Sequence, residues 1–150
     1  MITPADEALL RRAIAIAAHA ITVGDAPYGS LLADADGAIL IEAHNTVRRD
    51  NDIAAHPELK LARWAARELK PEAAARTTMY TSCQPCQMCA GGIARSGLGR
   101  VVYALSTEQL VRLNPASDWP TVTQEGPALL EEARAPIEEY YQPRRRPARP

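Results

Sequence analysis

The sequence predicts an α/β fold, a three-layer α/β/α sandwich built around a mixed five-stranded sheet. Two observations lead to this prediction. Stretches with helical periodicity alternate along the chain with short β-rich stretches, and parallel neighbouring strands need helical crossovers that pack on the sheet. The length of 150 residues also lies in the range of one compact domain. We therefore expect a single domain over residues 1–142, followed by a tail over residues 143–150.

The composition is that of an ordinary globular protein. Hydrophobic residues make up 47% of the chain and charged residues 23%, and the formal net charge is −1 at pH 7. A charge so close to zero gives no global attraction to polyanions, so nucleic acid is not expected as the main partner. The first residues are acidic where a secretory leader needs basic ones, and no apolar run approaches a membrane span. These features predict a cytoplasmic protein without a membrane partner.

The first elements are a long helix and a hairpin. Thr3 resembles an N-cap, with Pro4 in the first turn and Asp6 three residues on as a capping partner, and apolar residues recur at helical spacing from Pro4 to Val23. Two short apolar runs follow, over residues 28–33 and 38–43. The turn between them ends at Gly37, which can take a positive φ, so the two runs predict a β-hairpin.

The remaining elements follow from the same signals. Residues 45–55 are polar and predict a loop, whereas residues 143–150 alternate arginine with proline and predict a disordered basic tail. Further strands are predicted over residues 77–81, 100–105 and 121–123. Further helices are predicted from His56 to Pro71, over 90–96 with a stop at Gly97 or Gly99, through Leu113, and from about Pro127 to Tyr141.

All three cysteines lie in one short segment between Cys83 and Cys89. Such a cluster is too compact to tie a fold together and is odd in number, so metal binding or redox chemistry is expected instead. Cys83 and Cys86 form a C-x-x-C pair, but no thioredoxin-like context accompanies it. We therefore interpret Cys83 as a packed thiol near a metal.

A histidine and two cysteines supply three ligands of the kind that zinc prefers. Pro57 disfavours the helical region for His56, so the imidazole projects from the start of a helix. Cys86 and Cys89 lie one turn apart at the start of another helix, where the positive helix end favours thiolates. Three ligands leave a position for water, whose pKa falls to about 7 in a catalytic zinc site. Glu58 is then available to carry the proton.

The segments His56-Pro57-Glu58 and Pro85-Cys86-Gln87-Met88-Cys89 together resemble the zinc-dependent cytidine and deoxycytidylate deaminase superfamily. Residues 80–93 and 100–103 resemble its guanine deaminase and tRNA adenosine deaminase branches. The resemblance implies a cytidine deaminase-like fold and one zinc ion bound by His56, Cys86 and Cys89. It also implies that Glu58 shuttles protons during hydrolytic removal of an exocyclic amine.

Substrate contacts are implied by the same resemblance. Asn45 matches a position where these branches place an asparagine against the base or ribose, and the backbone near Ala55 and Ser82 is expected to contact the ring. Asp118 lies where guanine deaminases bring a second acidic group to the site. Asn45 could equally be a turn residue, and Asp118 part of a solvated loop. Gln84 stands where the family often has glutamate.

The resemblance favours a hydrolytic deaminase of a free nucleobase or nucleoside that releases ammonia. Guanine or a related purine or azapurine is the first choice, because of the Thr81-Ser82-Cys83 run. Deamination of adenosine in tRNA, and of cytosine or cytidine, are the alternatives within this class. A zinc-stabilised binding domain is the alternative from another class, although Glu58 would have no purpose in a purely structural site. A homodimer is expected from the resemblance alone.

Overall fold

The computed structural model describes residues 1–141, and these fall into two units, residues 1–118 and residues from 119 onward. Each unit is described by itself. The first unit holds every strand of the described chain and all three candidate zinc ligands. The predicted tail over residues 143–150 lies outside the described residues.

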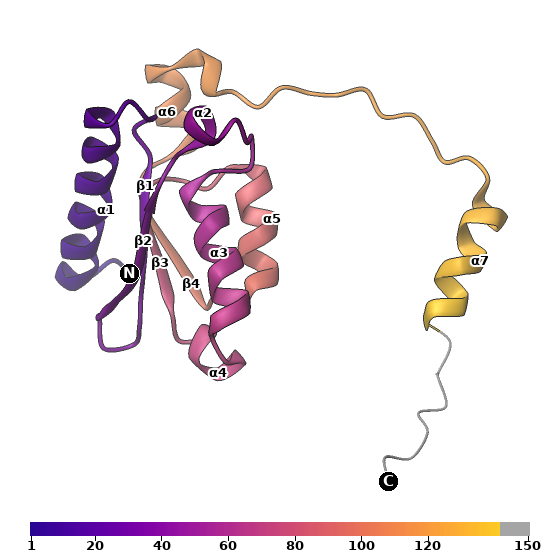
Figure 1. Cartoon of the computed structure of the whole chain (residues 1–150), viewed down its shortest axis with the longest axis horizontal. Helices are drawn as coiled ribbons and strands as arrows, with labels where there is room; N and C mark the ends of the chain where they lie inside the picture. Colours follow the sequence, from indigo (N-terminus) through magenta and orange to yellow (C-terminus); the bar gives the residue numbers. More distant parts are fainter. Residues whose placement is uncertain (142–150) are drawn as a thin grey trace, which may run out of the picture. The chain divides into compact units, whose positions relative to one another are not determined.

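One mixed sheet forms the centre of the first unit (Figure 1). Its strands β1 (Gly29–Ala33), β2 (Ile39–His44), β3 (Thr78–Cys83) and β4 (Arg100–Leu105) lie in the order β2-β1-β3-β4. β1 pairs antiparallel with both β2 and β3, and β3 pairs parallel with β4. Consequently β2, β3 and β4 run in one direction, and their carboxyl ends lie at the same edge of the sheet.

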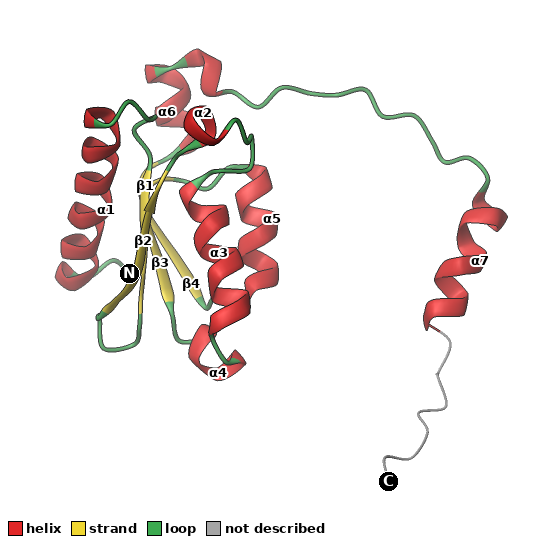
Figure 2. Ribbon diagram, viewed as in Figure 1, coloured by secondary structure: helices red, strands yellow, loops and turns green. Residues whose placement is uncertain are grey.

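Helices cover both faces of this sheet and complete the predicted three layers (Figure 2). α1 (Pro4–Thr22) packs on one face, while α3 (Pro57–Glu68) and α5 (Gln87–Ser96) pack side by side on the other. Successive strand side chains point to opposite faces, so β1 contributes Leu31 to the core under α1 and Leu32 to the core under α3 and α5.

Local sequence signals account for most helix ends. Thr3 caps α1 in a capping box with Asp6, as the sequence predicts, and the two residues satisfy each other's backbone amides. α5 ends at Gly97, whose φ of 84° is the left-handed conformation that glycine adopts readily. Among residues 1–141, each helix is too short or too polar to cross a lipid bilayer.

The sequence prediction of a fifth strand over residues 121–123 is wrong. The sheet of the described chain has four strands, and residues 121–123 have no regular structure. They follow Pro120 and belong to the second unit, whose described residues form no strand. β-propensity stabilises a strand only where neighbours pack against it.

Several short helices were also not predicted from the sequence. α2 (Val47–Asp50) lies inside the predicted loop, and α4 (Pro71–Ala74) follows the stop at Pro71. Single turns have too little periodicity to be recognised from sequence. The later elements are α6 (Thr107–Leu113), the 3₁₀ turn η1 (Pro115–Ser117) and α7 (Leu130–Tyr141), which begins three residues after the predicted Pro127.

Candidate metal centre and active site

The candidate site lies where two helices begin. α3 follows β2 after a loop, and α5 follows β3 almost directly, so both helices start beyond the carboxyl ends of parallel strands. Ligand sites commonly form at this edge of α/β sheets. The two helices approach closely, since a Cβ added to Gly92 of α5 would lie 2.5 Å from Leu59 Cδ1 of α3. This packing brings the two motif segments together.

Proline sets the backbone at the start of α3. His56 is the N-cap residue, with φ of −77° and ψ of 140°, and Pro57 is the first helical residue. Cys86 is the N-cap of α5, with φ of −66° and ψ of 171°. Neither side chain bonds to its own helix start. Both side chains are therefore free to meet each other across the two helix ends.

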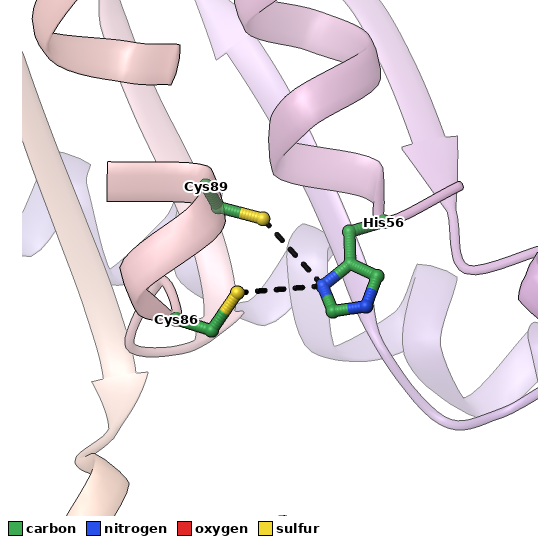
Figure 3. A group of neighbouring side chains, drawn as sticks. All are labelled: His56, Cys86 and Cys89. Atoms are coloured by element: carbon green, nitrogen blue, oxygen red, sulfur yellow. Dashed lines mark hydrogen bonds between the residues drawn. The ribbon is translucent and has the colours of Figure 1, made fainter. Parts of the chain in front are cut away.

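The three predicted ligands converge on one point (Figure 3). Nδ1 of His56 lies 3.6 Å from Sγ of Cys86 and 3.5 Å from Sγ of Cys89, and the three ligand atoms all lie within 4.8 Å of one another. Ordinary zinc–nitrogen and zinc–sulfur bonds at a tetrahedral angle separate these atoms by about 3.6 Å. The group therefore fits a tetrahedral zinc ion with three protein ligands.

The chemistry of the ligands agrees with this fit. A hydrogen bond from Cys89 and the nearby His56 lower the pKa of the Cys86 thiol to about 4. The contact with Cys86 raises the pKa of Cys89, as does burial. A bound cation stabilises both thiolates, because a coordinating thiol gives up its proton. A separate hydrogen bond, between His56 and Cys86, raises the pKa of His56.

Glu58 lies beside the ligand group without belonging to it. Its side chain is buried, and burial raises the pKa of its carboxyl group. Oε1 accepts a hydrogen bond of 3.1 Å from the hydroxyl of Thr81, and Oε2 lies 3.9 Å from Sγ of Cys89. A carboxylate held next to a three-ligand zinc site is suited to transfer protons.

The candidate substrate residues differ in where they lie. Asn45 is buried, and its Oδ1 accepts a 3.1 Å hydrogen bond from the amide of Val47. The next amide, that of Thr46, donates to the carbonyl of Ala55 at 3.0 Å, so the loop is joined to the residue before His56. Asn45 thus has the turn contact expected of the structural alternative, and its contact with substrate stays a prediction.

Ser82 and Asp118 have contrasting surroundings. Ser82 is buried at the end of β3, where its Oγ accepts a 3.1 Å hydrogen bond from the amide of Gly29. Asp118 is exposed at the end of η1, and its amide donates to the carbonyl of Pro115. The roles of Ala55, Ser82 and Asp118 in binding a ring stay predictions.

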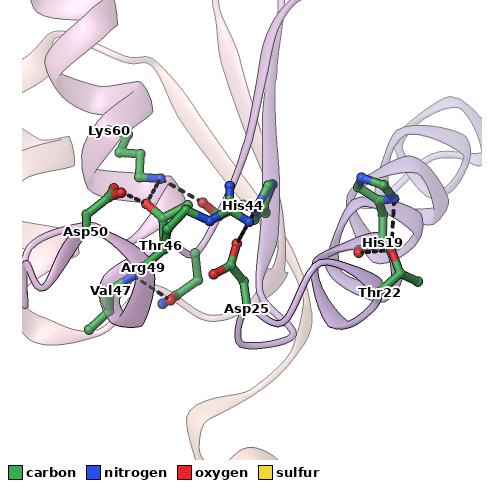
Figure 4. A network of polar contacts seen from close by, with 10 residues as sticks. His19, Thr22, Asp25, His44, Thr46, Val47, Arg49, Asp50 and Lys60 are labelled. Atoms are coloured by element: carbon green, nitrogen blue, oxygen red, sulfur yellow. Dashed lines mark hydrogen bonds and ion pairs between the residues drawn. The ribbon is translucent and has the colours of Figure 1, made fainter.

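A polar network that sequence reasoning missed supports the loop that carries Asn45 (Figure 4). Nζ of Lys60 donates to the carbonyl of His44 at 2.9 Å and to Oγ1 of Thr46 at 2.5 Å, and burial lowers the pKa of this amine. The buried carboxylate of Asp25 bonds Nε2 of His44 at 3.0 Å and Nη2 of Arg49 at 2.5 Å. These partners lie far apart in the sequence, so no local sequence pattern predicts their hydrogen bonds.

The family model for the cytidine and deoxycytidylate deaminase zinc-binding region matches residues 3–105. The chain belongs to this family. Its matched relatives include several deaminases, hydrolases that act on C–N bonds of cyclic amidines, and the His-Cys-Cys group fits one zinc ion per chain.

The relatives in this deaminase family act on different substrates. The chain is 34% identical over 137 residues to a probable cytosine deaminase of Schizosaccharomyces pombe. This alignment covers 89% of this chain and 81% of the relative. It is 36% identical over 99 residues to guanine deaminase of Bacillus subtilis, covering 65% and 63%. It is 33% identical over 101 residues to a tRNA-specific adenosine deaminase of Haemophilus influenzae, covering 67% and 58%. The last two matches span less than two thirds of the relatives' own lengths.

Among solved structures, that of Bacillus subtilis guanine deaminase resembles this deaminase over nearly its whole length. The TM-score is 0.72 at 29% sequence identity, and the alignment covers 89% of this chain and 92% of the other. The cytidine deaminase-like fold with a mixed sheet is thereby confirmed.

Proposed function

We propose that this deaminase removes the exocyclic amine of a free purine base by hydrolysis and that guanine is its preferred substrate. The observation that carries the proposal is the position of Glu58, a buried carboxylate outside the three-ligand group with Oε2 facing Cys89. A site that only stabilises the fold has no need of such a group.

His56, Cys86 and Cys89 would hold the zinc ion. When bound, zinc supplies a Lewis acid that makes water nucleophilic near neutral pH. Glu58 takes a proton from the water as its oxygen attacks the amidine carbon, and then gives a proton to the departing amine. Water and the amino-substituted ring are thus converted into the oxo-substituted ring and ammonia, without any further reactant.

Guanine is preferred for two reasons. Similarity to Bacillus subtilis guanine deaminase extends over nearly all of both chains in the structural comparison. The net charge of −1 also gives no general attraction to a polyanion such as tRNA. Cytosine is the second candidate, because the probable cytosine deaminase of Schizosaccharomyces pombe aligns with 89% of this chain.

Ammonia release tests the proposal directly. The zinc-loaded protein would be assayed with guanine, adenine, cytosine, their nucleosides and a tRNA anticodon stem-loop. We expect guanine to have the highest kcat/KM. A higher value for cytosine or for the stem-loop would refute the choice of substrate, whereas no turnover on any of them would favour the zinc-stabilised binding domain.

Glu58→Gln tests the proposed proton carrier. We expect zinc content and thermal stability to remain close to those of the parent protein and kcat to fall about 10²- to 10⁴-fold, which is the usual contribution of general acid–base catalysis. Full ammonia release by this variant would disprove the mechanism. Residence in the cytoplasm and assembly into a homodimer stay predictions from the sequence.

A further inference from the structure

A chain of buried hydrogen bonds ends on Glu58. Oγ of Ser30 in β1 donates to Oγ1 of Thr81 in β3 at 2.8 Å, and Thr81 donates to Oε1 of Glu58 at 3.1 Å. Ser30 and Thr81 are both 0% exposed. We infer that Thr81 is a positioning residue for Glu58 and that Ser30 fixes the direction in which Thr81 donates. This inference rests on the proposed function, in which Glu58 carries the proton.

The chemistry of the three groups gives the chain a single direction. A carboxylate can only accept hydrogen bonds, whereas a hydroxyl donates one and can accept as well. Because Ser30 donates to the oxygen of Thr81, the one hydroxyl hydrogen of Thr81 is left for Glu58. Removing Ser30 Oγ would take away the donor to the Thr81 oxygen and leave the hydrogen bond to Glu58 as the remaining contact of this chain on Thr81.

The sheet holds the two hydroxyls rigidly. Ser30 and Thr81 are directly opposite each other in the antiparallel pairing of β1 with β3, the two central strands. Side chains opposite each other on one face of an antiparallel pair lie close enough to interact. The first two members of the chain are therefore fixed by strand register and do not depend on a loop.

The two oxygens of Glu58 have different roles as a result. Thr81 holds Oε1, whereas Oε2 lies 3.9 Å from Sγ of Cys89 and faces the ligand group. A catalytic group held in this way needs no reorientation in each turnover. Displacement of a reacting group by about 1 Å can lower a rate about 100-fold.

Thr81→Val in the zinc-loaded protein tests the inference, because valine keeps the shape of threonine and lacks the hydroxyl. We expect kcat to fall about 10- to 100-fold, with KM and zinc content close to the parent values. Thr81→Ser should recover most of the loss, because it restores the donor. Thr77→Val is the matched control, since Thr77 is also buried and its hydroxyl donates to the backbone carbonyl of Ala73 at 2.9 Å.

Three outcomes would overturn the inference: an unchanged kcat in Thr81→Val, an equal loss in Thr77→Val, or no recovery in Thr81→Ser. If Thr81→Val fails to fold, Ser30→Ala decides, with a lower kcat in support and an unchanged kcat against. If the parent protein turns over no base, the proposed function fails, and crystal structures of the zinc-loaded proteins decide the inference. A Glu58 carboxylate turned away in Thr81→Val supports it, and an unmoved carboxylate refutes it.

Discussion

Asp6 and Arg100 lie 94 residues apart in the chain and form a two-pronged ion pair. Nη1 of Arg100 lies 2.7 Å from Oδ1 of Asp6, and Nη2 lies 3.0 Å from Oδ2. The hydroxyl of Tyr80 also donates to Oδ1 at 2.7 Å. The buried carboxylate at the start of α1 is thereby fastened to β3 and β4.

This ion pair predicts a specific loss of stability in acid. Arg100, Tyr80 and Thr3 hold the pKa of Asp6 far below its usual range. Its stabilisation is therefore complete above the ordinary aspartate pKa of about 3.9 and declines as pH falls below that value. Asp6→Asn should lower the free energy of unfolding by about 2 kcal/mol at pH 7, because charged hydrogen bonds are lost.

Urea unfolding of the parent and Asp6→Asn proteins between pH 7 and pH 3 measures this effect. The difference in free energy of unfolding between the two proteins should narrow below about pH 4, where Asp6 of the unfolded chain is protonated. Glu7→Gln is the control, since Glu7 is exposed and pairs with Arg11 on the helix surface, where an ion pair contributes little. A difference that does not change with pH would contradict the prediction.

Removal of the metal is expected to abolish turnover and lower the thermal midpoint. Chelation should do so reversibly, with recovery on addition of zinc, and Cys89→Ser should do so permanently because it removes a ligand. Cys83→Ala serves as the control, since Cys83 lies outside the ligand group of the described chain. Metal analysis should give one zinc ion for Cys83→Ala and much less for Cys89→Ser. Loss of zinc from Cys83→Ala would instead support a role for the Cys83 thiol at the metal.

Lys60 predicts a change in substrate binding. Its amine holds the carbonyl of His44 and the hydroxyl of Thr46, on either side of Asn45. Lys60→Met should free this loop, and steady-state kinetics should show KM rising about 10-fold while kcat changes little, which is the pattern for lost ground-state binding. Arg63→Met, on the exposed side of the same helix, should leave both constants unchanged. A fall in kcat at constant KM would argue against this role.

Two glycines predict opposite responses to the same substitution. A Cβ on Gly29 would lie 2.5 Å from backbone atoms of Ala13 and Ala17, so Gly29→Ala must push α1 away from β1 and should cost about 3 kcal/mol. Gly91 of α5 has open space at its Cβ position. Gly91→Ala should therefore stabilise the fold by about 0.5–1 kcal/mol through helix propensity. Chemical denaturation of both variants measures the two effects, and equal destabilisation would refute this account.

Local chemistry made part of the structure predictable from sequence. Thr3 with Asp6 marks a helix start, Pro57 sets the backbone of His56, and Gly97 ends a helix, and each signal acts within a few residues. His56, Cys86 and Cys89 could be proposed as ligands because each lies in a motif at a helix start, and the family resemblance implied that the two motifs meet. Fold class and the parallel crossover followed from the alternation of elements.

Features that depend on contacts between distant segments could not be predicted. Ser30 and Thr81 are 51 residues apart, and only the register of β1 with β3 places them opposite each other. Lys60 reaches the loop before its own helix for a similar reason. The error at residues 121–123 has the same origin, because a strand needs a pairing partner elsewhere in the chain, which β-propensity alone does not predict.

The two helix starts at the site lack a side-chain cap. His56 and Cys86 occupy the N-cap positions of α3 and α5, yet neither bonds the first amides of its helix, unlike Thr3 and Ser106 in α1 and α6. A zinc ion bound by these residues would therefore hold the first turns of α3 and α5 together. Occupancy of the centre should then be readable in backbone amide exchange, with the opening turns of α3 and α5 slowing together when zinc binds and the start of α1 unaffected.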